Sequence, residues 1–112
     1  MNPCRGEIWL CSLDPAVGHE QGGRRPCLVV SADELNNSPA DLVIVLPVTS
    51  RGKNIPTRVA AVPPEGGLNL PSFIQCEMVR SISKRRLSKR LGSIASGTME
   101  NIEKELRLLF DL

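Results

Sequence analysis

The sequence is poor in the side chains that most often carry acid–base catalysis and base stacking. Among its 112 residues it has one histidine, His19, no tyrosine, and three aromatic residues, Trp9, Phe73 and Phe110. A nuclease that uses a pair of histidines is therefore excluded within one copy of the chain, and three rings are too few for a platform on which several bases stack. A Ser-His-Asp triad would have to use His19, which lies beside Gly18 and is expected to be exposed.

Long apolar segments and closely spaced cysteines are also absent. No apolar stretch reaches the roughly 18 residues of a membrane span, and the first residues lack the pattern of a secretion signal, so we expect a cytoplasmic protein with no membrane partner. The four cysteines contain no C-x-x-C pair, which argues against a metal site, and no cofactor is expected. Cys11, Cys27 and Cys76 lie in apolar segments, where a thiol fills a core as a small hydrophobic group.

Length and charge set broad limits. With 112 residues, 41% of them hydrophobic, the chain suits one domain that spans residues 1–112. Fourteen Lys and Arg against twelve Asp and Glu give a net charge of +2. So small an excess does not identify a nucleic-acid-binding protein, and the distribution of the charges has to decide.

Nine glycines and nine prolines separate short apolar segments, a pattern typical of strands joined by turns. We predict strands at residues 7–13, 27–31, 42–46, 58–62 and 73–82, and a single helical turn at 33–37. Residues 42–46 are apolar without a break, which predicts a central strand covered on both faces. The fold class is therefore mainly β with some α (α+β), built as a small barrel.

Two periodic patterns refine this prediction. In the last strand, Gln75 and Glu77 alternate with apolar residues and are expected to face solvent. Near the C-terminus, apolar residues at helical spacing predict one amphipathic helix, with Thr98 as its N-cap and Gly97 just before it. The apolar positions of this helix are Met99, Ile102, Leu106, Leu109 and Phe110.

The loop at residues 18–26 has the most unusual composition. Gly22 and Gly23 permit a ligand to approach the backbone, and Pro26 restricts the conformation of Arg25 at the start of a strand. A guanidinium held in this way matches the oxygens of a phosphate. A hairpin loop with solvated arginines has the same composition.

Two further polar segments follow. Thr49, Ser50, Arg51 and Lys53 come directly after the central strand, where a scaffold can present functional groups, although Thr and Ser also form turns. Six cations then fall within eleven positions, which suits a solvated basic surface, a phosphodiester backbone or an acidic peptide. They are Arg80, Lys84, Arg85, Arg86, Lys89 and Arg90.

Together these segments resemble the MazF/PemK family of toxin endoribonucleases. The resemblance rests, in order, on GEIW at 6–9, LDP at 13–15, GHEQGGRRP at 18–26, LPVTS at 46–50, VRSI at 79–82 and KRRL at 84–87. It implies an SH3-like β-barrel with a C-terminal helix that works as a homodimer. It also implies the toxin of a type II toxin–antitoxin system, which cuts single-stranded RNA at short sequences without metal and is neutralised by a cognate antitoxin.

The resemblance places the catalytic pair of the family on Arg25 and Thr49. In a transesterification the ribose 2′-hydroxyl attacks the adjacent phosphorus, so Arg25 would stabilise charge on the phosphoryl oxygens and Thr49 would hold the reacting groups in line. Glu20 is a candidate base, a cap of the loop or a contact to a base edge. Further RNA contacts are expected from Gln21, Arg24, Ser50 and Lys53.

One departure from the family and one alternative function remain. Met78 stands where family members often carry Gln, so base readout cannot be transferred by analogy. The alternative function is a non-enzymatic toxin, similar to the CcdB-like proteins that bind DNA gyrase. Such a protein has no need of an arginine fixed beside a hydroxyl group.

Overall fold

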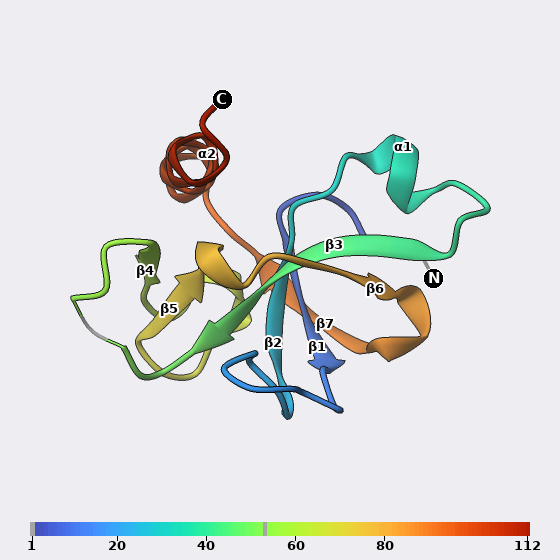
Figure 1. Ribbon diagram of the computed structural model, residues 1–112, viewed down its shortest axis with the longest axis horizontal. Helices are drawn as coiled ribbons and strands as arrows, with labels where there is room; N and C mark the ends of the chain where they lie inside the picture. Colours follow the sequence, from blue (N-terminus) through green and yellow to red (C-terminus); the bar gives the residue numbers. More distant parts are fainter. Residues whose placement is uncertain (1, 53) are drawn as a thin grey trace.

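The computed structural model describes residues 2–52 and 54–112, which form an antiparallel sheet with a C-terminal helix (Figure 1). The α+β class predicted from the sequence is confirmed. The strands are β1 (Glu7–Ser12), β2 (Arg24–Val29), β3 (Leu42–Thr49), β4 (Arg58–Ala61), β5 (Ser72–Gln75), β6 (Arg80–Ser83) and β7 (Leu87–Ser93). The helices are α1 (Asp33–Asn36) and α2 (Ser96–Phe110), with 3-10 turns η1 (Glu65–Gly67), η2 (Cys76–Met78) and η3 (Lys84–Arg86).

Strand β3 is the centre of the sheet, as its unbroken apolar sequence predicts. The strand order is β4-β5-β3-β2-β1-β7, and β6 also pairs with β3. Along one edge β3 pairs first with β6, up to Val45, and then with β5, from Val48. Pro47 lies at this change of partner, where a residue without an N–H is tolerated. The end of β3 therefore emerges between β2 and β5.

The core side chains lie on two faces of this sheet, because successive side chains of a strand point to opposite sides. Odd-numbered and even-numbered positions therefore belong mostly to different clusters. Odd-numbered positions such as Cys11, Cys27 and Val45 form one apolar cluster, which Ile82 and Leu87 complete. Even-numbered positions such as Leu28 and Leu46 form the other, onto which α2 packs. Cys11, Cys27 and Cys76 are buried and free, so their predicted role as core filler is confirmed.

Helix α2 starts three residues earlier than the sequence predicts. Ala95, in extended conformation, is its N-cap, and the N–H of Met99 bonds to the carbonyl oxygen of Ala95 at 3.1 Å. Thr98 is therefore inside the first turn and does not cap the helix. Gly97 also lies inside this turn and does not precede the helix. None of the helices in the described ranges is both long and apolar enough to cross a membrane.

The predicted strand at 73–82 is wrong as one element, because η2 divides it into β5 and β6. Strand β7 was not predicted at all. Of its seven residues only Leu87 is buried, and it lies at the sheet edge on β1 with two irregularities of register, so its sequence lacks the alternation of a half-buried strand.

The turn η2 also redirects Glu77, which was predicted to face solvent. Its carboxylate is only about 24% exposed and accepts hydrogen bonds from Arg58 Nε and the Thr57 hydroxyl, each at 2.9 Å. Burial raises the pKa of Glu77, but hydrogen bonds from its own backbone, Thr57 and Arg58 outweigh burial and hold the pKa below its usual 4.5. This ion pair ties β4 to the turn after β5.

We predict that Ile102→Ala lowers the free energy of unfolding by about 2–5 kcal/mol, because it leaves a cavity where α2 meets the sheet. Ile102 is 0% exposed. Lys104→Ala on the same helix, where the side chain is exposed, is the control and should change stability by less than about 0.5 kcal/mol. Urea denaturation followed by circular dichroism measures both, and equal losses would contradict the assigned packing.

We also predict that Glu77→Gln weakens the acid dependence of stability. Because the folded pKa is lowered, the unfolded chain binds the proton first, so Glu77 stabilises the fold above its usual pKa and this contribution is lost as the pH falls below about 4.5. Unfolding free energies measured between about pH 6 and pH 3 should therefore fall less steeply in the variant. The slope should not vanish, because the pKa of Glu7 is lowered too. An unchanged slope would rule out the ion pair in solution.

Candidate functional site

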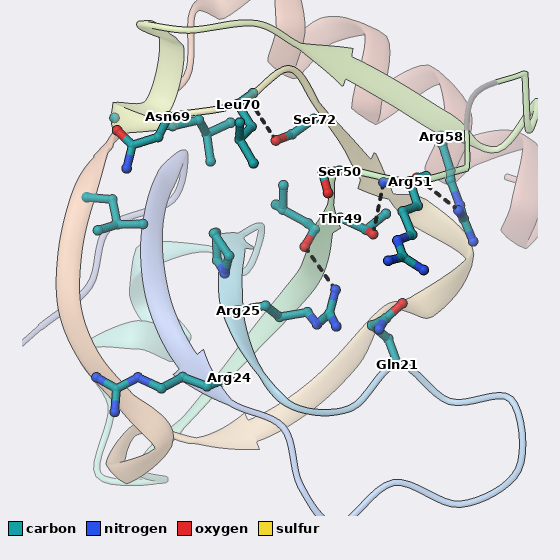
Figure 2. Close-up of a pocket in the computed structure, with 15 residues that line it drawn as sticks. Gln21, Arg24, Arg25, Thr49, Ser50, Arg51, Arg58, Asn69, Leu70 and Ser72 are labelled. Carbon is teal, nitrogen blue, oxygen red and sulfur yellow. Dashed lines mark hydrogen bonds between the residues drawn. The ribbon is translucent and has the colours of Figure 1, made fainter.

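The register of β2 with β3 brings the two predicted catalytic residues together. Strands β2 and β3 pair at Val29↔Val45, Leu28↔Leu46 and Cys27↔Pro47, and Arg25 and Thr49 each lie two residues beyond the last of these pairs. The Nη1 atom of Arg25 lies 3.5 Å from the carbonyl oxygen of Val48, which places the guanidinium beside the end of β3. Figure 2 shows both side chains at the same cavity.

This cavity has a volume of about 670 Å³ and contains most of the residues that the sequence singles out. Gln21, Arg25, Thr49 and Ser50 lie along one side of it, whereas Arg24 points away from Arg25 along another (Figure 2). The other lining residues are Pro26, Val48, Arg51, Arg58, Gly67, Leu68, Asn69, Leu70, Ser72 and Leu91. Lys53 lies outside the described residues.

Several contacts fix the guanidinium of Arg25. Its Nε donates to the carbonyl oxygen of Gly22 at 2.8 Å, and Nη1 lies 3.5 Å from the carbonyl oxygen of Val48. With the amide oxygen of Gln21 facing Arg25, that oxygen accepts from Nη2 at 2.8 Å and from Nη1 at 3.2 Å. This orientation gives both the oxygen and the nitrogen of the Gln21 amide a suitable partner, because an arginine can only donate. The guanidinium is thus held at both ends before any ligand is present.

The hydroxyl of Thr49 is oriented by the segment that follows it. Its Oγ1 accepts a hydrogen bond from the backbone N–H of Arg51 at 3.2 Å (Figure 2). Since this contact uses a lone pair, the proton of the hydroxyl remains available to an oxygen in the cavity. A guanidinium and a hydroxyl donor therefore converge on one space.

The cavity is strongly positive. Four arginines line it: Arg24, Arg25, Arg51 and Arg58. Arg58 is neutralised by Glu77, but among the described residues no carboxylate forms a salt bridge with the other three. Adjacent uncompensated guanidinium groups favour a multiply charged anion such as a phosphodiester chain.

The basic segment at 80–90 mostly supports the fold. Arg80 Nη1 donates to the carbonyl oxygen of Leu13 at 3.2 Å, and Arg86 Nη1 donates to that of Asp14 at 2.6 Å. Arg90 pairs with Glu7 at 2.6 Å. The contacts of Arg80 and Arg86 anchor the end of β1 and the start of the loop that carries Gln21, and that of Arg90 ties the start of β1 to β7, so the solvated-surface interpretation accounts for only part of the segment.

That loop is also held by its own side chains. The Asp14 carboxylate accepts from the Gly23 N–H at 2.8 Å, and Glu20 Oε1 accepts from the Val17 N–H at 2.7 Å. Of the three roles considered for Glu20, this geometry corresponds to the cap of the loop, and Glu20 does not line the cavity. His19 is exposed, as predicted.

Sequence reasoning missed the opposite wall, made by residues 67–70, Ser72 and Leu91. This wall exists because η1 approaches β7 more closely than any side chain permits. Gly67 has φ +71°, and a Cβ there would overlap the carbonyl oxygen of Leu91, while a Cβ on Gly92 would lie 2.7 Å from the Gly67 nitrogen. Leu70 is 60% exposed at this wall and offers an apolar surface opposite the arginines.

Gln75 corrects another prediction. The alternation predicts that its side chain faces solvent, yet Gln75 is 0% exposed. It is the last residue of β5, between β3 and β4, and its amide meets the amide of Gln21. The strand stops there and η2 follows, so the alternation that predicted exposure does not continue. Only the tertiary position of the loop reveals this contact.

No group of three or more His, Cys, Asp or Glu residues within residues 2–52 and 54–112 is arranged to hold a metal ion. The buried thiols are not nucleophiles either. A hydrogen bond with Cys11, together with burial, raises the pKa of Cys27, and burial raises the pKa of Cys76 to about 12. The polar chemistry of the cavity is therefore that of arginine, hydroxyl and amide groups.

Comparison with known proteins agrees with this chemistry. The endoribonuclease MazF9 of Mycobacterium tuberculosis is 36% identical over 113 residues, covering 96% of each chain. The endoribonuclease PemK of Escherichia coli is 41% identical over 100 residues, covering 88% of this chain and 74% of PemK. Both are named as endoribonucleases, which favours that function over gyrase binding.

Solved structures of Deinococcus radiodurans MazF have the same fold. The crystal structure of MazF (Form-I) is 29% identical, with a TM-score of 0.89 over 100% of this chain and 99% of that one. The MazE–MazF complex (Form-II) gives 30% identity and a TM-score of 0.81 over 100% and 98%.

A family model described as the PemK-like, MazF-like toxin of type II toxin–antitoxin systems matches residues 4–110. The expected resemblance is thereby confirmed over nearly the whole chain. The chain belongs to the MazF/PemK family of toxin endoribonucleases of type II toxin–antitoxin systems.

Proposed function

We propose that this endoribonuclease cleaves single-stranded RNA at short sequences by a metal-independent transesterification in the cavity of Arg25 and Thr49. The observation that supports the proposal is that these two residues follow the last β2–β3 pair on their strands and line one cavity. Neither group is a good general base, so the chemistry that suits them is one in which the substrate supplies its own nucleophile. RNA does so through the 2′-hydroxyl.

In the proposed step the 2′-oxygen attacks the adjacent phosphorus and the bond from phosphorus to the 5′-oxygen breaks. The products are a 2′,3′-cyclic phosphate and a 5′-hydroxyl; the proton lost by the 2′-hydroxyl balances the one gained by the leaving oxygen. Negative charge builds on the phosphoryl oxygens during the attack. The preorganised guanidinium of Arg25 stabilises this charge, and the free proton of the Thr49 hydroxyl donates to one of these oxygens and holds the phosphate in line.

Flanking nucleotides would be bound by the rest of the cavity. Arg24 and Arg51 suit neighbouring phosphates, and Ser50 offers a hydroxyl beside the scissile group. Gln21 is close enough to Arg25 to contact the same nucleotide. Glu20 supports the loop in this conformation, so we assign it a structural role rather than that of the base.

The assembly we propose is a single SH3-like β-barrel domain that functions as a homodimer in the cytoplasm. Apolar side chains at the end of α2 support a partner surface, since Leu108 and Phe110 are 74% and 55% exposed. The MazE–MazF complex of D. radiodurans supports a cognate antitoxin as a second partner of this chain. A disordered acidic or apolar segment of the antitoxin would fill the cavity, because the cavity has both positive charge and an apolar wall.

We predict that Arg25→Ala lowers kcat for RNA cleavage in EDTA by about 100- to 1000-fold, because one preorganised donor to the developing charge is lost. Arg25→Lys should recover little of this loss, since an ammonium cannot reproduce the planar set of donors. Arg85→Ala is the control, because that side chain is 90% exposed and lies outside the cavity. Gel analysis of a mixed RNA measures all three variants. An Arg25→Ala variant that keeps its activity would contradict the catalytic role of Arg25.

We predict that the cognate antitoxin and RNA compete for the cavity. Adding antitoxin should raise the apparent KM for RNA without changing kcat at saturating RNA, as expected when two ligands share one positive site. The measurement is a series of cleavage rates at several antitoxin and RNA concentrations. A tight toxin–antitoxin complex that still cuts at the full rate would refute the shared site.

A further inference from the structure

Gln75 is a buried polar side chain that the assigned chemistry leaves unexplained. Among the residues that the structure describes, the buried polar side chains are Ser31, Asn36, Ser72 and Gln75. Ser31 and Asn36 bond to each other, and the Ser72 hydroxyl donates to the nearby carbonyl oxygen of Leu70. The amide of Gln75 instead contacts the amide of Gln21, which is 54 positions away in the loop at residues 18–26. Burial of an amide is unfavourable unless it is bonded, so this long-range contact determines whether Gln75 is tolerated.

The side chains of Arg25, Gln21 and Gln75 form a relay of hydrogen bonds, and the donor and acceptor of each bond are fixed. Because Arg25 only donates, the oxygen of Gln21 must face it, at 2.8 Å from Nη2. The nitrogen of Gln21 then points to Gln75 Oε1, at 3.2 Å. The orientation of one amide thus sets the next, from the guanidinium to the interior of the sheet.

The two ends of this relay differ in rigidity. Gln21 belongs to a loop whose residues 14–20 are all exposed, so its side chain has little packing to hold one rotamer. Gln75 is wholly buried in β5, which pairs on both sides, with β3 and β4. A bond from Gln75 therefore transfers the rigidity of the sheet to the loop.

We propose that Gln75 is a positioning residue for RNA cleavage, which holds the Arg25 guanidinium in its productive orientation through the amide of Gln21. The proposal rests on the proposed function, because it assigns the orientation of Arg25 to the transition state. An apolar side chain of similar size would fill the same volume without an amide to satisfy, so packing alone does not account for a glutamine here.

The test is a double-mutant cycle of Gln75→Met and Gln21→Ala in the cleavage assay. Each single variant should lower kcat about tenfold and change KM less than about twofold, because a displaced guanidinium weakens transition-state contacts while Arg24 and Arg51 still bind RNA. The double variant should also lose about tenfold, because both substitutions break one relay. A loss of about a hundredfold in the double variant, or full kcat in either single variant, would overturn the proposal.

A second measurement is independent of activity. In ¹⁵N spectra, Gln75→Met should shift the side-chain amide of Gln21 and the Nε–H of Arg25, while the Nε–H of Arg24 stays in place. An unmoved Arg25 signal would overturn the proposal even if the wild-type chain cut no RNA, in which case the proposed function fails separately. If Gln75→Met does not fold, Gln75→Leu, which also lacks the amide, takes its place in both measurements, and full kcat or an unmoved Arg25 signal in that variant overturns the proposal likewise.

Discussion

The function of this molecule depends on one constraint, the antiparallel register between β2 and β3. The ladder ends at Cys27↔Pro47, and Arg25 and Thr49 follow two residues further along their strands, where both line the cavity. A slip of one residue would turn every side chain of β3 to the other face and separate the two groups. The apolar cluster that contains Cys27 and Val45 therefore specifies the chemistry as well as the fold, because the same parity governs both.

Charge at the cavity follows from which arginines receive a partner. Arg58, brought to the site by β4, is satisfied by Glu77, whereas Arg25 is held by carbonyl and amide oxygens, which fix a guanidinium without neutralising it. A carboxylate beside Arg25 would hold it as firmly but would cancel the charge that a phosphate requires. Neutral acceptors around a functional arginine thus reconcile fixed geometry with an uncompensated positive charge. The preference of the cavity for anions is a consequence of this choice of partners.

The sequence predicts what depends on local pattern, and the structure departs from it where contacts are long-range. The central strand at 42–46 is apolar without a break, and Arg25 and Thr49 flank apolar segments, so local composition marks all three, whereas the resemblance to the family names the last two as a catalytic pair. Gln75 could not, because its burial depends on a loop 54 positions away. The sequence did not predict strand β7, because an edge strand with one buried residue has no alternation of apolar and polar residues. In the sequence, only Gly67 and Gly92 indicate the second wall of the cavity. Glycines mark turns far more often than close contacts, so these two residues could not predict it.

The two walls differ in chemistry, and this difference bears on what enters the cavity. One wall presents guanidinium and hydroxyl groups at strand ends, and the other presents Leu68, Leu70 and Leu91 with the amide of Asn69. A nucleotide has the same two-sided character, since its phosphate is charged and its base is flat and largely apolar on its faces. The chain has too few aromatic rings for stacked bases, so under the proposed function the aliphatic wall would be the surface for a base whose phosphate lies at Arg25. Discrimination between bases then falls to polar groups at the rim, because an aliphatic surface contacts every base alike.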